Sequence, residues 1–144
     1  MRLVDVNVLL YAFREDAANH SRCRAWVEGV LASDEAYAVS DHVLAGFLRV
    51  ATHPRIFHPP APLDLALSFA EAFRDRPNAV GVSPGGRHWE IFTRLCVEAE
   101  ASGNLVPDAW LAALAIEHGC EFITTDRGYA RFSSLRWRHP LEGG

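Results

Sequence analysis

The chain opens with a long apolar segment. Residues Arg2–Phe13 (RLVDVNVLLYAF) are interrupted by only two strongly polar positions inside the run, Asp5 and Asn7. The β-branched content of this segment predicts a strand buried on both faces, as in a parallel sheet. Shorter apolar runs predict further strands at about 36–39, 80–82, 122–124 and 135–137.

Between these runs, apolar residues recur at intervals of three and four, which is the pattern of amphipathic helices. Ser40 can cap one of them, and Gly119 can close the last. The stripes predict one helix that starts near 19–21 and four further helices at about 40–52, 65–73, 89–103 and 107–118.

Strands that alternate with helices are typical of a three-layer α/β/α fold. We therefore expect an α/β protein with a mostly parallel sheet of four to five strands. Nothing along the chain suggests a linker between domains, so residues 1–141 are expected to form a single domain, followed by a short tail at 142–144.

The composition narrows the possible chemistry. All 14 basic residues are Arg and none is Lys, which excludes Walker A phosphate loops, Schiff-base enzymes and other lysine-dependent catalysts. The three cysteines are too far apart for a CxxC pair, so we expect reduced thiols and a cytoplasmic protein without a membrane span. The formal net charge of −4 is unusual for a nonspecific nucleic-acid binder.

Three aspartates fall where predicted strands end or a helix begins. Asp5 interrupts the first apolar run, Asp126 follows the strand at 122–124, and Asp108 opens the last helix. Each has a simple alternative role, as a buried cap, a turn residue or a helix cap. In parallel sheets, however, such positions meet at one edge, where converging carboxylates would repel each other without a hard divalent cation such as Mg²⁺ or Mn²⁺.

Four motifs, taken together and in this order, resemble PIN-domain proteins and more narrowly the VapC toxins of bacterial toxin–antitoxin modules. The similarity runs over essentially the whole chain. The motifs are VDVNVLLYA at 4–12, FLRVATHPR at 47–55, PDA with LAALA at 107–115, and TTDRGY at 124–129.

The resemblance implies a PIN-domain fold and a metal-dependent endoribonuclease that hydrolyses RNA with Mg²⁺ or Mn²⁺. Asp5, Asp108 and Asp126 would be its catalytic, metal-binding acids, Asn7 would support the first of them, and Thr124 would be the hydroxyl that often precedes the last. The resemblance also implies inhibition by a cognate VapB antitoxin and a homodimer.

One position departs from the family pattern. Gly46 stands where relatives commonly carry a Glu in the helix after the second strand. Either three acids suffice, or another residue substitutes, or the chain is a catalytically weak protein that binds RNA or antitoxin. Asp41 lies on the wrong side of the helix to replace the Glu, whereas His42 is one turn earlier on the same face, and Glu98 and Glu100 could approach from elsewhere.

Because Lys is absent, any phosphate contact must come from Arg. We take Arg49 and Arg127 as candidate substrate-binding residues, because guanidinium groups bind phosphates bidentately and stack on unpaired bases. A DNA-directed nuclease would use the same metal chemistry, and the sequence does not separate it from a ribonuclease. The arginines that flank the proposed site in sequence are Arg14, Arg22, Arg24, Arg49, Arg55, Arg127 and Arg131.

Overall fold

The computed structural model describes residues 1–142, so positions 143 and 144 of the expected tail lie outside the described residues. Six α-helices, one 3₁₀ helix and five strands are found in the described part of the chain. In chain order they are β1 (Arg2–Val4), α1 (Val6–Phe13), α2 (His20–Ala32), β2 (Tyr37–Val39), α3 (Asp41–Ala51), α4 (Leu63–Arg74), β3 (Ala79–Gly81), α5 (His88–Glu98), α6 (Leu105–Glu117), β4 (Glu121–Ile123), η1 (Arg127–Arg131) and β5 (Trp137–Arg138).

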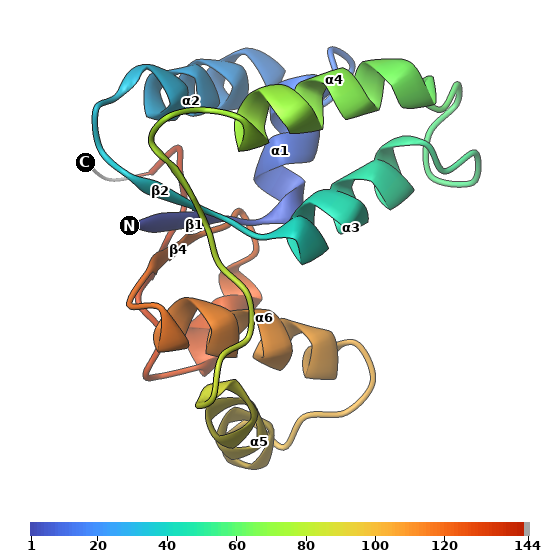
Figure 1. Ribbon diagram of the computed structural model, residues 1–144. Helices are drawn as coiled ribbons and strands as arrows, with labels where there is room; N and C mark the ends of the chain where they lie inside the picture. The colour runs from blue at the N-terminus through green and yellow to red at the C-terminus, as the bar shows by residue number, and fades with distance from the viewer. Residues whose placement is uncertain (143–144) are drawn as a thin grey trace.

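The strands form one sheet in the order β3-β2-β1-β4-β5, and every neighbouring pair is parallel. Helices α1 to α4 cover one face of the sheet, while α5 and α6 cover the other (Figure 1). The predicted three-layer α/β/α fold with a parallel sheet is therefore confirmed.

The prediction that Arg2–Phe13 forms a single strand is wrong. The strand ends at Val4, and Asp5 is the N-cap of α1, with its side chain accepting a hydrogen bond from the Val6 amide. Helix α1 is almost wholly apolar because it packs between the sheet and helices α2 and α3, with Val8 and Leu9 fully buried. A fully enclosed helix shows no amphipathic stripe, and so its sequence looks like a buried strand.

Other helix boundaries follow the expected signals more closely. The Ser40 hydroxyl caps α3 by accepting a hydrogen bond from the Val43 amide at 3.3 Å. Helix α6 begins at Leu105, slightly before the predicted start at Pro107, so Asp108 lies in its first turn rather than at its cap. Gly119 follows α6 with a φ of +65°, a left-handed conformation that glycine adopts without strain.

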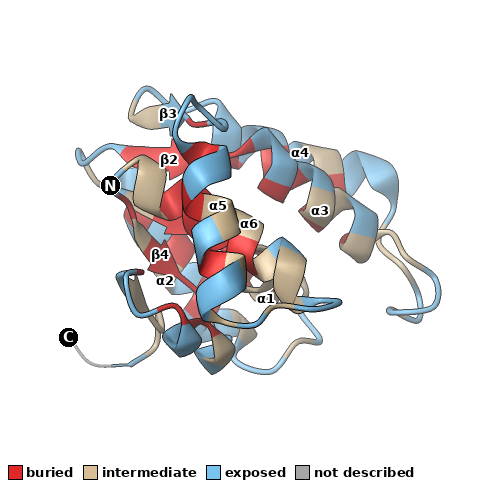
Figure 2. Ribbon diagram, turned by 90° about the horizontal axis from the view of Figure 1, so that it is seen from below, coloured by how far each residue is buried: buried red, intermediate tan, exposed pale blue. Residues whose placement is uncertain are grey.

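The core lies between the sheet and the inward faces of the helices, as the buried residues in Figure 2 show. The cysteines are free thiols, as expected, and two of the three are buried. Within residues 1–142, no helix has the length and apolar character needed to cross a membrane.

Candidate functional site

The strand order places a topological switch point between β1 and β4. From β1 the chain passes outward to β2 and β3, and it then returns through α5 and α6 to place β4 on the other side of β1. In open parallel sheets, ligands bind at such switch points, outside the carboxyl ends of the strands. Val4 pairs in register with Ile123, so Asp5 and Thr124 emerge side by side at this edge.

Asp5 is a buried carboxylate, with 7% of the residue exposed. Its Oδ1 accepts a hydrogen bond from the Val6 amide at 2.7 Å, and its Oδ2 accepts hydrogen bonds from the Thr124 hydroxyl at 2.7 Å and the Asn7 side-chain amide at 3.2 Å. The pKa of Asp5 is raised to about 6, mainly by burial and also by the negative charges of Asp108 and Asp126, against the opposing effect of its hydrogen bonds. A nearby cation would stabilise the ionised form of a carboxyl in these surroundings.

Thr124 connects the two strand ends. Its hydroxyl donates to Asp5 and accepts hydrogen bonds from the Asp126 amide at 3.0 Å and from the Asn7 side-chain amide at 3.3 Å. The Asn7 carbonyl oxygen in turn accepts from the Thr125 amide at 3.3 Å. Asn7 and Thr124, expected from the resemblance to support the acids, therefore fix the position of Asp5 against the loop that carries Asp126.

Asp126 caps the 3₁₀ helix η1, and its Oδ1 accepts a hydrogen bond from the Gly128 amide at 2.8 Å. Asp108 reaches the same region from the first turn of α6, where its pKa is raised by partial burial and by the charge of Asp126. A hydrogen bond from Tyr129 and the nearby positive charge of Arg131 act in the opposite direction on Asp108. These mutual effects show that the structure brings the three aspartates into one electrostatic cluster.

Tyr129 is a site residue that sequence reasoning missed. It is buried, and its hydroxyl donates a hydrogen bond to Asp108 Oδ1 at 3.2 Å. Burial and the three surrounding carboxylates raise the pKa of Tyr129, so that the phenol stays protonated and remains a donor. Two signals were available: its place three residues after Asp126, and its membership of the TTDRGY motif.

The three aspartates suit a hard divalent cation by their donor chemistry. Asp108 and Asp126 each keep one carboxylate oxygen, Oδ2, that accepts no hydrogen bond from residues 1–142. As the side chains stand in residues 1–142, no group of three or more Asp, Glu, His or Cys residues is placed so that together they could hold a metal ion. Mg²⁺ is usually held by one or two carboxylates and keeps several waters, so an open cluster of this kind fits it.

Several residues expected near the site make other contacts. Arg127 forms an ion pair with Glu142, and Arg49 is exposed near the end of α3. Arg14 pairs with Asp16 and lies over the ring of Phe57. Arg131, whose charge acts on Asp108, is the arginine that the structure places beside the cluster.

The residues considered as substitutes for the missing Glu also have defined positions. Glu98 faces Arg94 at 3.9 Å on the surface of α5, and Asp41 pairs with Arg74 at 2.8 Å. The His42 ring packs on the Trp110 indole, with ring centroids 4.5 Å apart. None of these contacts adds a further carboxylate to the cluster.

Gly46 has a packing role. A Cβ atom at this position would lie 3.3 Å from Cγ2 of Val6, the residue that follows Asp5. Helix α3 thus approaches the start of α1 closely at Gly46. The side chain of a residue placed here would begin beside the acid cluster.

Comparison with known proteins agrees with this geometry. The PIN domain family model matches residues 2–135. The chain is 46% identical to ribonuclease VapC25 of Mycobacterium tuberculosis over 97% of its length and 99% of the relative's. It is 44% identical to VapC ribonuclease Mb2897 of Mycobacterium bovis, over 99% of this chain and 97% of the relative.

Solved structures show the same fold at lower identity. VapBC-1 from nontypeable Haemophilus influenzae matches with a TM-score of 0.70 at 16% identity, over 98% of both chains. VapBC2 from Rickettsia felis, bound to a DNA fragment from its promoter, matches with a TM-score of 0.67 at 20% identity, over 95% of this chain and 96% of that one. By its sequence and its fold, the chain belongs to the PIN domain family, among the VapC ribonucleases.

Proposed function

We propose that the protein is the endoribonuclease toxin of a toxin–antitoxin module, and that it hydrolyses RNA phosphodiester bonds with Mg²⁺ or Mn²⁺ held at Asp5, Asp108 and Asp126. The observation that carries the proposal is the cluster itself. Three carboxylates, one directly after β1, one in the first turn of α6 and one shortly after β4, lie at the switch point of the sheet, and their charges act on one another. The names of the most similar curated relatives support RNA as the substrate.

Within this proposal, the bound cation supplies two things: it neutralises charge on the phosphate, and it makes a water molecule more acidic. The protein's own residues hold the three carboxylates in position. Thr124 and Asn7 hold Asp5 in place, the Gly128 amide orients Asp126, and the Tyr129 hydroxyl orients Asp108. Arg131 is a positive group suited to a phosphate oxygen.

The partner proposal rests on the fold neighbours. The matched solved structures are VapBC assemblies, which supports a VapB-type antitoxin as the partner of this chain. We also propose a homodimer and a cytoplasmic location, because the family resemblance points to the first and the three free thiols agree with the second.

Cleavage of a labelled single-stranded RNA in the presence of Mn²⁺ tests the activity. Asp5→Asn and Asp126→Asn should each reduce cleavage at least about a hundredfold, because each removes a negative charge needed to hold the cation. Asp64→Asn is the matched control, since Asp64 is an exposed aspartate in the first turn of α4. An Asp126→Asn protein that cleaves RNA as fast as the control would contradict the assignment of the acids.

Two further measurements separate the alternatives. Calorimetric titration of the wild type with Mn²⁺ should show binding that Asp126→Asn weakens, and no binding at millimolar Mn²⁺ would count against metal-dependent catalysis. Unlabelled DNA of the same sequence should compete poorly with the RNA. Equal cleavage of the DNA would favour the DNA-directed nuclease.

A further inference from the structure

A second concave site lies beside the acid cluster. It has a volume of about 400 Å³, within the range of about 300–1,000 Å³ typical of small-ligand pockets. Its walls come from the carboxyl ends of β2 and β3, the start of α3, the end of α4, and α6. The residues used below are Ser40, Asp41, His42, Arg74, Ser83 and Trp110.

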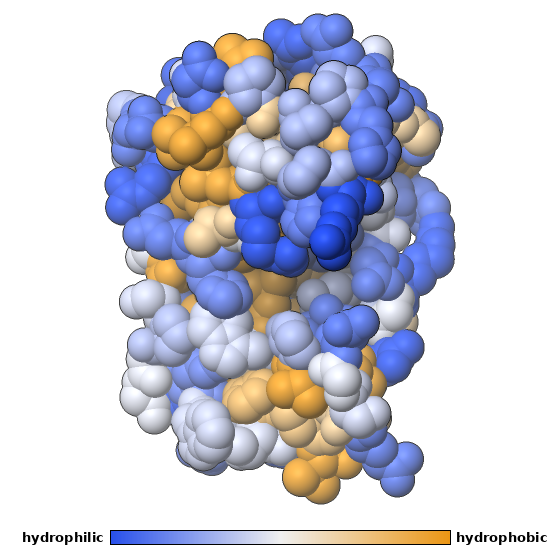
Figure 3. All heavy atoms as spheres, turned by 90° about the vertical axis from the view of Figure 1, so that its right-hand side faces the viewer, coloured by the Kyte–Doolittle hydropathy of each residue, from blue (hydrophilic) through white to orange (hydrophobic). Residues whose placement is uncertain are grey.

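This pocket and the acid cluster share one edge of the sheet. Leu3 pairs in register with Ala38, so Ser40 in the pocket wall and Asp5 in the cluster follow adjacent parallel strands. Helix α6 links them as well, because it carries both Asp108 and Trp110. In Figure 3, which faces this side of the molecule, a hollow with apolar residues in its floor separates the upper and lower parts of the surface.

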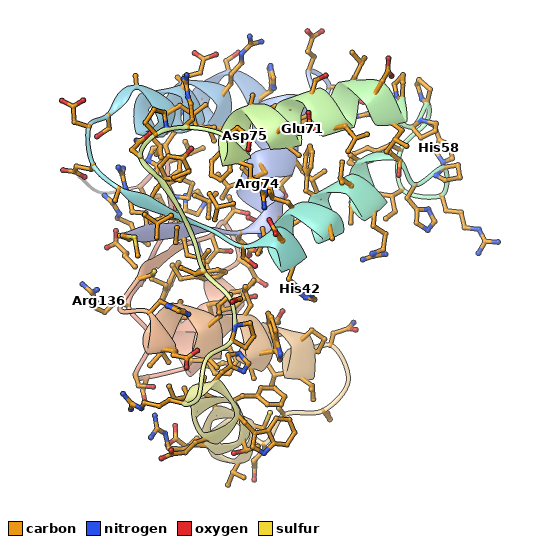
Figure 4. The ribbon with its side chains drawn as sticks, in the orientation of Figure 1. His42, His58, Glu71, Arg74, Asp75 and Arg136 are labelled. Atoms are coloured by element: carbon orange, nitrogen blue, oxygen red, sulfur yellow. The ribbon has the colours of Figure 1, made fainter. Side chains whose placement is uncertain are left out.

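Trp110, the aromatic residue of the pocket wall, is held in place by contacts with two histidines. The His42 ring lies 4.5 Å from the Trp110 indole, and His88 packs against the same indole at 4.8 Å. The Nε2 atom of His88, a buried residue, is 2.9 Å from the Trp110 carbonyl oxygen. Figure 4 shows His42 projecting from the first turn of α3 toward α6, so its ring stands at the opening of the pocket.

The charged residues in the wall compensate each other. Arg74 donates two hydrogen bonds to the Asp41 carboxylate, at 2.8 and 3.2 Å. This pairing leaves the lining nearly neutral, which suits an uncharged flat ring with polar edges better than a phosphate. The Ser83 residue of the lining adds a hydroxyl, which can both donate and accept a hydrogen bond at such an edge.

We propose that this pocket binds one unpaired nucleobase of the RNA, next to the phosphodiester that reaches the acid cluster, and that His42 and Trp110 form its stacking surface. The inference rests on the proposed ribonuclease function and specifies its substrate as RNA with a splayed-out base. Stacking on aromatic side chains is a common mode of single-strand recognition and needs no net positive charge.

The test measures binding without cleavage. A fluorescent single-stranded RNA pentanucleotide is titrated with the protein in EDTA, and its anisotropy is recorded. His42→Ala should weaken binding by about fivefold or more, because a base loses its stacking partner. His42→Phe should retain the affinity, and His58→Ala is the matched control, since His58 is an exposed histidine in the loop between α3 and α4 (Figure 4).

A second arm identifies the base. Pentanucleotides with a single abasic site are compared at each position. The wild type should lose affinity at one position, and His42→Ala should show a clearly smaller loss at that same position, since the two changes remove a shared contact and only the Trp110 contact is left to lose.

The possible failures are distinguishable. If the wild type binds and cleaves RNA but His42→Ala behaves like His58→Ala, the pocket proposal is overturned and the nuclease proposal stands. If the wild type neither binds nor cleaves RNA, both proposals are overturned.

Discussion

The Tyr129 hydroxyl donates a hydrogen bond to Oδ1 of Asp108 at 3.2 Å, and so joins the turn after β4 to the first turn of α6. The bond therefore ties Asp108 to the turn that Asp126 caps. The bond orients Asp108 and lowers its pKa against the effect of burial. Tyr129 acts here as a positioning residue.

Tyr129→Phe isolates this effect. The ring still fills the space beside Phe122, so the free energy of unfolding should fall by only about 1 kcal/mol, the usual net value of one hydrogen bond. The pKa of Asp108 should rise, which moves the acidic limb of the pH–rate profile for RNA cleavage to higher pH. Cleavage at several pH values and urea unfolding check both parts, with Tyr11→Phe as control. An unchanged pH profile would show that the bond does not matter for activity.

The burial of Asp5 predicts a pH-dependent cost to folding. Its pKa rises from 3.8 to about 6 in the folded protein, so the folded state holds this proton more tightly than the unfolded chain. The stabilising effect is complete below pH 3.8 and is lost as the pH rises through about 6. A shift of roughly two pKa units corresponds to about 3 kcal/mol. Relative to Asp5→Asn, the metal-free wild type should lose about this much stability between pH 4 and pH 7.

Urea unfolding of both proteins in EDTA across this pH range gives the difference directly. Adding Mn²⁺ at pH 7 should restore stability to the wild type and have less effect on Asp5→Asn, because a cation that binds only the folded state stabilises it. A pH-independent difference between the two proteins would mean that Asp5 titrates normally in the folded state.

Thr124 should matter more for stability than a surface threonine. Thr124→Val keeps the shape of the side chain but leaves Asp5, Asn7 and the Asp126 amide without their shared partner. We expect a loss of about 1–3 kcal/mol in unfolding free energy, the cost of leaving buried polar groups unpaired, together with weaker cleavage. Thr124→Ser retains the hydroxyl and should recover most of both. A loss in Thr124→Ser as large as that in Thr124→Val would mean that the hydroxyl alone does not account for the role of Thr124.

Gly46→Glu tests whether the missing fourth acid limits the reaction. The added Cβ would require Val6 to move by a few tenths of an ångström, and removing a mid-helix glycine gains on the order of 1 kcal/mol, so the fold should persist. If the three aspartates form a sufficient site, cleavage should increase less than about tenfold, while Mn²⁺ affinity rises because another carboxylate lies near the cation. Gly46→Ala is the control for packing.

A gain of several hundredfold in cleavage by Gly46→Glu, absent in Gly46→Ala, would contradict a sufficient three-acid site. It would identify the wild type as the catalytically weak protein considered from the sequence.

The sequence was most informative about the order of strands and helices and about polar residues that stand at their ends. The alternation of strands and helices predicts the layers, and Asp5, Asp108 and Asp126 stand out because they fall where strands end or a helix begins, positions that meet at one edge of a parallel sheet. The division of Arg2–Phe13 at Asp5 was missed because a helix enclosed on all sides has no polar stripe. A segment of twelve residues is, however, long for a strand, and Asp is a favoured helix N-cap.

Tertiary contacts between distant segments were beyond sequence reasoning. Nothing in the sequence places the Tyr129 hydroxyl on Asp108, or sets the ring of His42 against Trp110, because each pair depends on how α6 packs under the sheet. The same holds for Gly46, whose contact with Val6 depends on how closely α3 crosses α1. The roles proposed for Arg49 and Arg127 in substrate binding stay predictions.

The central position of β1 bears on when the protein becomes active during its synthesis. Asp5 is synthesised well before Thr124 and Asp126, which follow β4. A nascent or prematurely terminated chain that ends before β4 lacks both the last acid and the hydroxyl that holds the first. Under the proposed function, the set of three aspartates is complete only in a chain that has been translated past β4.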